Sequence, residues 1–156
     1  MIEEKQKFSN IWLWLLLLLI NFWMLYAVIQ QLIFKIPVGS NPAPDLGLVV
    51  AFLTTFSILV LFKIMYLKVL GNKTTLTIIF FPFVRKEIPI KDIQRVEVVT
   101  YNSLMEYGGW GIRYGGQGWA YNVGGNHGLR ITLHNGKSIL VGIRNKEQFE
   151  NYINTI

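Results

Sequence analysis

The chain has 156 residues, of which 52% are hydrophobic, 15% are charged and none is cysteine. This length holds one modest domain plus a membrane anchor, and the lack of cysteine excludes disulfides, thiol chemistry and cysteine-based metal sites. The net charge of +6 comes from residues 63–156, because residues 1–62 carry three lysines and three acidic residues.

Two apolar runs near the N-terminus predict a pair of membrane-spanning helices, over residues 11–34 and 46–66. The first run has no charged residue and, at about 1.5 Å per residue, is long enough to cross a hydrocarbon core of about 30 Å. It is too long for the apolar region of a cleaved signal peptide. The second run is interrupted only by Lys63, and three prolines in the segment between the runs predict a short hairpin connection.

The lysines that flank the two runs predict the orientation. Lys5 and Lys7 precede the first run. The second run is flanked at its end by Lys63, Lys68 and Lys73, and the connecting loop has only Lys35. Because positive charge concentrates on the cytoplasmic side, we expect both termini in the cytoplasm and the protein in the inner membrane. Residues 1–10 are then a cytoplasmic N-terminal segment.

Four polar residues lie near the middle of the predicted spans: Asn21 in the first, and Thr54, Thr55 and Ser57 in the second. An antiparallel hairpin places them at similar depth, where an amide can hydrogen-bond a hydroxyl. We expect them to stabilise helix packing, within the hairpin or between protomers. The alternative is that these residues line an ion or substrate pathway in an accessory subunit of a transport complex. No ionisable group is buried with them, as such a pathway would require.

From residue 67 onward the pattern predicts a mainly β domain. Alternating or β-rich segments occur at residues 65–70, 75–80, 85–88, 94–101, 129–133 and 138–143. Asn145 then predicts a helix N-cap, with Gln148 completing a capping box, and an apolar stripe follows at Phe149, Tyr152, Ile153 and Ile156. We expect a small barrel or sandwich over residues 67–156, closed by this amphipathic helix.

Residues 101–128 combine nine glycines with six tyrosines or tryptophans. Glycine permits sharp turns and close approach of the backbone, and the aromatic rings supply area to bury. Residues 110–114 and 119–123 read as two strands of a hairpin around Gly115-Gly116-Gln117-Gly118. The segment is therefore expected to be ordered.

The string YGGWGIRYGGQGWAYNVGGNHG, with the strand order and the terminal helix, resembles the bacterial pleckstrin-homology-like (PH-like) membrane proteins. In that group two transmembrane helices precede a PH-like barrel that carries a similar Tyr-Gly-Gly-Trp-Gly-Ile-Arg-Tyr element. The resemblance covers most of residues 65–156 and implies a fold, but hardly any function.

Two interpretations of the glycine-aromatic segment remain open. In the first, the aromatic rings only cap the core. In the second, they form a binding surface for a protein partner or a second copy of the chain, made of Trp110, Arg113, Tyr114, Trp119 and Tyr121. Because neighbouring side chains alternate along a strand, we expect Arg113 to face outward and Tyr114 to pack inside.

Other site types have weaker sequence support. The glycines of residues 101–128 lack the spacing of a phosphate-binding loop. Nucleic-acid binding would require basic residues among the aromatic ones, and Arg113 is the only lysine or arginine in this segment. His127 and His134 have no partners at metal-ligand spacing. Glu106 is a candidate general base for an enzyme that uses a glycine-rich pocket, although no nucleophile or second carboxylate is implied beside it. We therefore expect neither a cofactor nor a metal, and a non-catalytic binding or scaffolding module.

Five basic residues are candidate contacts for anionic lipids of the inner leaflet. They are Lys63, Lys68, Lys73, Arg85 and Lys86. Each can gain about 1 kcal/mol near such a surface. The alternative is that these residues only reflect the usual excess of positive charge on the cytoplasmic side and the solvated faces of strands, without binding lipid.

Overall fold

The computed structural model describes residues 1–155, and the chain divides into two compact units. One unit is the helical hairpin Asn10–Ile64. The other joins Met1–Ser9 to the chain from Met65 onward. The predicted domain, which began at residue 67, therefore omitted an N-terminal segment that belongs to the same fold.

The hairpin unit consists of two antiparallel helices. Helix α1 (Ile11–Val28) continues into a π-helical turn at Ile29–Ile33, and helix α2 spans Asp45–Ile64. The side chain of Asn10 caps α1 by accepting a hydrogen bond from the backbone N–H of Trp12. Both helices are long and apolar enough to cross a membrane, and their side chains are largely exposed. These observations are consistent with membrane anchoring.

The polar residues of the hairpin pair differently from the prediction. The Asn21 amide donates to the carbonyl oxygen of Leu17 in its own helix, at 2.8 Å, and to that of Thr55, at 3.3 Å. The hydroxyls of Thr54, Thr55 and Ser57 instead donate to carbonyls of α2 itself. A serine or threonine hydroxyl readily bonds the preceding turn of its helix, which leaves it unavailable to the amide. The hydrogen bond from Asn21 to the other helix is therefore made to the Thr55 backbone, and nearer the connecting loop the Gln31 amide donates to the Asp45 carboxylate at 2.8 Å.

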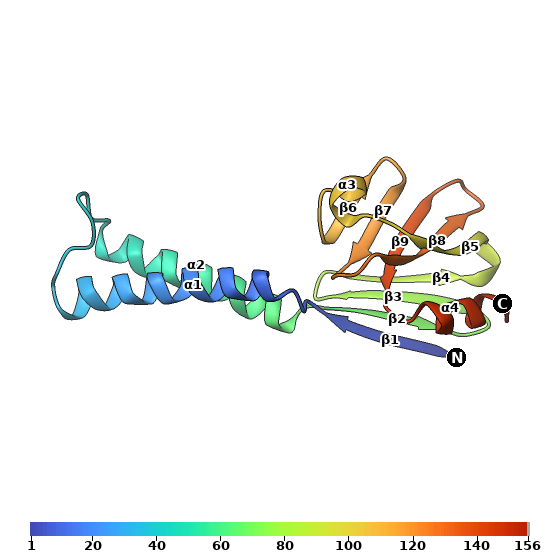
Figure 1. Ribbon diagram of the computed structural model, residues 1–156, viewed down its shortest axis with the longest axis horizontal. Coiled ribbons are helices and arrows are strands. Elements are labelled where there is room, and N and C mark those ends of the chain that lie inside the picture. The colour runs from blue at the N-terminus through green and yellow to red at the C-terminus, as the bar shows by residue number, and fades with distance from the viewer. Residues whose placement is uncertain (156) are drawn as a thin grey trace. The chain divides into compact units, whose positions relative to one another are not determined.

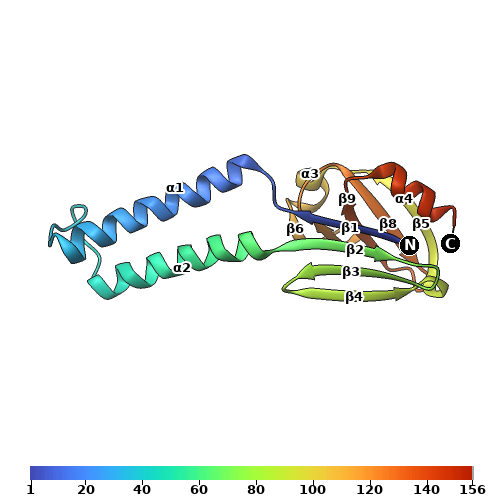
Figure 2. The same ribbon diagram turned by 90° about the horizontal axis from the view of Figure 1, so that it is seen from below.

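The first sheet of the other unit has four antiparallel strands in the order β1-β2-β3-β4. They are β1 (Ile2–Lys7), β2 (Tyr66–Gly71), β3 (Thr75–Phe81) and β4 (Val84–Pro89). Strand β1, which the sequence pattern did not predict, lies along β2 with Lys5 opposite Lys68 (Figure 2). The strands predicted at 65–70, 75–80 and 85–88 are confirmed within one residue at each end.

The second sheet has five strands in the order β5-β8-β9-β7-β6. They are β5 (Ile93–Thr100), β8 (His127–Leu133), β9 (Ser138–Ile143), β7 (Gly118–Asn122) and β6 (Gly111–Gly115). The pairing of β7 with β9 is parallel and all other pairings are antiparallel. The 3-10 turn Ile90–Asp92 joins the two sheets, whose strands cross at a steep angle (Figure 1).

The main core lies between the facing sides of the two sheets. Leu76, Ile78 and Phe80 of β3 are fully buried on one side, and Leu129 and Ile131 of β8 are fully buried on the other. Among residues 1–155 no strand pairing links the two sheets, so they are not closed into a barrel.

A second, smaller core covers the outer face of the five-stranded sheet. It contains Tyr101, Tyr107, Ala120 and Leu140, with Val99 packed beside it. Helix α3 (Ser103–Tyr107), a single short helix, supplies Tyr107 to this cluster. Both faces of β7 and β9 are consequently buried along much of their length.

Helix α4 (Lys146–Ile153) follows the last strand and packs against β5 and β1. The predicted N-cap is confirmed, because the Asn145 side chain accepts a hydrogen bond from the backbone N–H of Gln148 at 3.1 Å. The predicted capping box is wrong, because the backbone N–H of Asn145 donates to the carboxylate of Glu4 at 2.9 Å and not to Gln148. Phe149 and Tyr152 are buried, and the Tyr152 hydroxyl donates to the carbonyl oxygen of Asn72 at 2.8 Å. The last member of the predicted stripe, Ile156, lies outside the described residues.

Candidate binding surface

The β6–β7 hairpin is held close to the start of β9. Gly118 begins β7 with φ of 102°, a conformation that L side chains rarely adopt, and its Cα faces the backbone carbonyl of Ser138. No side chain fits between them. The close approach of Gly118 to Ser138 therefore sets the backbone position of the next residue, Trp119.

Tyr114 and Trp119 form an exposed aromatic pair. They are directly opposite across β6 and β7, with ring centroids 5.3 Å apart in an edge-to-face arrangement. The Tyr114 side chain is 72% exposed and that of Trp119 is 45% exposed. The prediction that Tyr114 packs inside is wrong, because β6 is the last strand of its sheet and Tyr114 lies where the facing sheet no longer covers it.

The other predicted surface residues are dispersed. Tyr121 is only 5% exposed and belongs to the core, where its ring stacks with that of Trp119 at 6.5 Å. Arg113 is exposed, as predicted, but it lies opposite Ala120 and so faces the other side of the sheet. Its guanidinium Nε donates to the Trp110 carbonyl at 3.2 Å. Trp110, 37% exposed, lines a different hollow beside α3.

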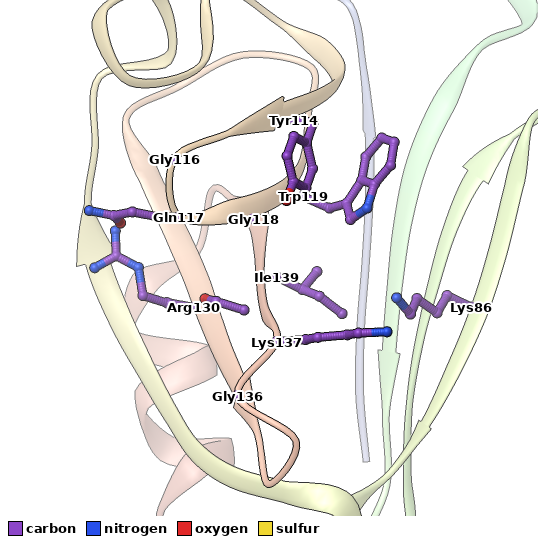
Figure 3. A pocket seen from close by; sticks show the side chains of 11 residues that line it. Lys86, Tyr114, Gly116, Gln117, Gly118, Trp119, Arg130, Gly136, Lys137 and Ile139 are labelled. Carbon is purple, nitrogen blue, oxygen red and sulfur yellow. The ribbon is translucent and has the colours of Figure 1, made fainter.

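A cleft of about 670 Å³ opens beside the Tyr114–Trp119 pair. Its wall includes the β6–β7 turn, the start of β9 and, from the other sheet, Lys86 of β4. Figure 3 shows the amines of Lys86 and Lys137 extended toward each other, next to Ile139 and below the two rings. Arg130 and Gln117 line a separate part of the same hollow, on the far side of β9 (Figure 3).

The five basic residues expected to touch lipid do not share one surface. On the outer face of the first sheet, Lys68 pairs with Glu3 and Arg85 pairs with Glu87, each at 2.7 Å. Lys73 is exposed in the β2–β3 turn, and Lys63 belongs to α2 in the other unit. Lys86 has the opposite direction from Arg85 and lines the cleft.

Sequence reasoning missed the cleft residues Lys137, Gln117 and Ile139. Lys137 is an ordinary turn residue in the printed sequence, and only the parallel pairing of β7 with β9 brings it to the aromatic pair. One signal was present in the sequence. Lys86 lies two residues from Val84 and two from Ile88, so in a strand it shares their inward face.

The buried polar groups beneath the outer face of the five-stranded sheet have structural roles. The fully buried Asn122 accepts from the backbone N–H of Gly111 at 3.0 Å and donates to the Ser103 hydroxyl at 3.4 Å. Burial raises the pKa of the Tyr101 hydroxyl above its ordinary value of 10.0, and burial likewise raises the pKa of Tyr107, which Arg130 partly offsets. These tyrosines are neutral at physiological pH.

Glu106, the candidate general base, caps a helix. Its carboxylate accepts a hydrogen bond from the backbone N–H of Asn102 at 2.8 Å, and the Asn102 side chain accepts from the backbone N–H groups of Leu104 and Met105. This is the reciprocal capping arrangement at the start of α3. Among residues 1–155, no three His, Asp or Glu side chains converge as metal ligands.

Comparison with family models, with curated proteins and with solved structures finds no match to this chain.

Proposed function

We propose that this protein is a two-span inner-membrane protein whose β domain is a non-catalytic, PH-like binding or scaffolding module for a protein partner. The single observation that carries the proposal is the exposed pair of Tyr114 and Trp119 beside a cationic cleft. Aromatic residues are enriched among the residues that dominate the energy of protein interfaces. Several exposed rings in one patch mark an interaction site more strongly than scattered ones.

The pairing of β1 with β2 supports the proposed orientation. Strand β1 ends at Lys7, before α1, and β2 begins at Tyr66, after α2. Two strands can pair only on the same side of a membrane, so α1 and α2 must both cross it or both remain outside. The lysines at these ends favour the cytoplasm for that side.

The order of elements supports the PH-like assignment. Two sheets of mostly antiparallel strands, followed by a C-terminal helix, fit the resemblance drawn from the glycine-aromatic string. The open pairing between the sheets and the extra strand β1 are departures from a closed barrel. A catalytic role has less support, because the carboxylate of Glu106 is engaged at the start of α3.

Site-specific photocrosslinking in native membranes tests the binding role. A photoreactive phenylalanine analogue replaces Tyr114 in the full chain, and the control carries it at Lys91, which is exposed outside the cleft. We expect a discrete adduct of higher mass from position 114 and none from position 91. Equal labelling at both positions, or none at either, would contradict a binding surface at the hairpin.

Protease access tests the orientation. The β domain should be digested in inside-out vesicles and protected in right-side-out vesicles. Digestion from the outside would show that the domain faces away from the cytoplasm.

A further inference from the structure

Lys86 stands at a position where the fold elsewhere places apolar residues. It lies between Val84 and Ile88 on the inward face of β4, directly opposite Ile78, which is fully buried. An apolar side chain there would extend the core. A lysine at such a position breaks the local pattern without a gain in packing, and departures of this kind concentrate at functional sites.

The cleft concentrates positive charge that the domain does not neutralise. Lys86 and Lys137 extend toward each other from the two sheets (Figure 3). Among residues 1–155, no aspartate or glutamate lines the cleft, and neither lysine has a carboxylate within ion-pair distance. Arg85, the residue before Lys86 in the same strand, is by contrast paired with Glu87. The cleft therefore attracts a negatively charged group.

A free strand edge borders the same cleft. Among the described strands, β4 pairs only with β3, so its other edge keeps unpaired backbone N–H and C=O groups. An extended peptide can add to such an edge by main-chain hydrogen bonds, with its alternate side chains directed to one face. On the inward side of β4, those alternate side chains would enter the cleft beside Lys86.

We propose that the cleft binds an acidic, extended segment of a protein partner, which adds to the free edge of β4. An acidic side chain of the segment lies between Lys86 and Lys137, and an apolar side chain two residues away packs on Trp119 and Tyr114. This inference rests on the proposed function, because it names the partner's chemistry at the same surface. It predicts a ligand in which acidic and apolar residues alternate on one side of a strand.

The combination of features favours a peptide over a small anion. Two ammonium groups alone would suit either ligand. The exposed rings add an apolar surface that a bare anion cannot use, and the strand edge adds a row of main-chain groups that only another backbone can satisfy. The charge of the ligand gives attraction and orientation, and the backbone pairing gives register.

Peptide binding to the full chain in lipid nanodiscs tests the inference. The probe is a fluorescein-labelled peptide of about eight residues, a typical strand length, with Glu and Val alternating on one side and Thr on the other. We expect saturable binding that weakens as salt is added. A peptide with Lys in place of Glu should not bind. A peptide methylated on alternate backbone nitrogens should bind about tenfold more weakly, because it cannot pair with the edge.

Matched variants locate the binding site. Lys86→Gln and Lys137→Gln should each raise Kd about tenfold. Arg85→Gln removes the same charge one residue away, on the opposite face, and should change Kd less than about twofold. Lys86→Met keeps the long apolar stem, so it retains the fold and still loses binding. Trp119→Ala should weaken binding as well.

Three results would overturn the inference. Equal losses from Arg85→Gln and Lys86→Gln would show attraction to overall charge. Unchanged affinity of the methylated peptide would exclude addition to the edge. Full competition by inorganic phosphate or by vesicles containing phosphatidylglycerol, with no dependence on peptide sequence, would identify a general anion site. If these peptide tests fail while photocrosslinking at position 114 still captures a partner, the binding function stands and only its acidic-strand chemistry is wrong.

Discussion

Gly118 passes directly over the backbone carbonyl of Ser138, with no space for a Cβ between them. This contact joins the β6–β7 turn to the start of β9 and so sets one wall of the cleft. We predict that Gly118→Ala destabilises the domain by about 3 kcal/mol, from backbone strain and steric overlap together. Gly116→Ala, in the same turn with nothing within 4 Å of its Cβ, should change the free energy of unfolding by less than about 0.5 kcal/mol. Chemical denaturation of both variants measures the two free energies of unfolding. If Gly118→Ala lowered stability no more than Gly116→Ala, the close approach of Gly118 to Ser138 would be unimportant for stability.

The exposed and buried aromatic residues of the hairpin should respond in opposite ways to truncation. We predict that Tyr114→Ala lowers stability by less than about 1 kcal/mol, the range of an exposed cross-strand pair. Tyr121→Ala should cost about 3–5 kcal/mol, because its ring is buried between the sheets. Thermal or urea unfolding checks both values. A large loss for Tyr114→Ala would assign it a structural role and weaken the case for a binding surface.

Asn21 makes a polar contact between the two helices near the middle of the hairpin. We predict that Asn21→Leu weakens helix association by about 0.6 kcal/mol, the average for interhelical hydrogen bonds in membranes. Ser57→Ala is the matched control, because that hydroxyl bonds only the Leu53 carbonyl of its own helix. Steric-trapping or detergent-unfolding measurements compare the two variants. No difference between them would indicate that packing of apolar side chains alone holds the hairpin.

The N-terminal strand should be necessary for the β domain. The Gln6 side chain is buried and donates to the carbonyl oxygen of Gly142 in β9 at 2.8 Å, a contact between distant parts of the chain. We predict that Gln6→Ala lowers stability by about 1–3 kcal/mol, because it leaves that carbonyl without this donor. Lys7→Gln, at an exposed position of the same strand, should be nearly neutral. Removal of residues 2–7 should abolish cooperative unfolding of the domain, and a cooperative transition in that variant would refute a structural role for β1.

Alkaline pH should destabilise the domain through its buried tyrosines. The folded-state pKa values of Tyr101 and Tyr107 lie above the ordinary value of 10.0, so the unfolded chain loses these protons first. Their contribution to stability is therefore complete below pH 10 and is lost as the pH rises through the folded-state pKa values. We predict that Tyr101→Phe flattens the decline of the unfolding midpoint above pH 10. An unchanged decline in the Tyr101→Phe variant would show that the Tyr101 hydroxyl does not contribute to it.

The regular elements were predictable because each has a local signal. Alternation at Leu76, Ile78 and Phe80 and the cap at Asn145 depend on neighbours in sequence, and both are confirmed. Strand β1 lacks such a signal. Its inward positions are Ile2, Glu4 and Gln6, only one of them apolar, and its partner β2 lies beyond two helices.

The surface was less predictable than the fold. The composition of the glycine-aromatic segment left open whether its rings are buried or exposed, since exposure depends on where the facing sheet ends. Tyr114 shows this, because its alternation is that of an inward residue and yet it is exposed at the sheet edge. The approach of Lys137 to Lys86 depends on packing between two sheets, about which the neighbours of either lysine carry no information.

The placement of β1 has a consequence for the order of events during biosynthesis. Residues 2–7 are synthesised before both helices, but their pairing partner at residues 66–71 is made only after them. In the proposed two-span arrangement, the first strand stays unpaired until both helices have inserted into the membrane. In that arrangement, a chain in which one helix fails to insert would leave the two strands on opposite sides of the membrane, and the β domain would remain incomplete and open to proteolysis. The proposed topology thus makes completion of the β domain depend on the insertion of both helices.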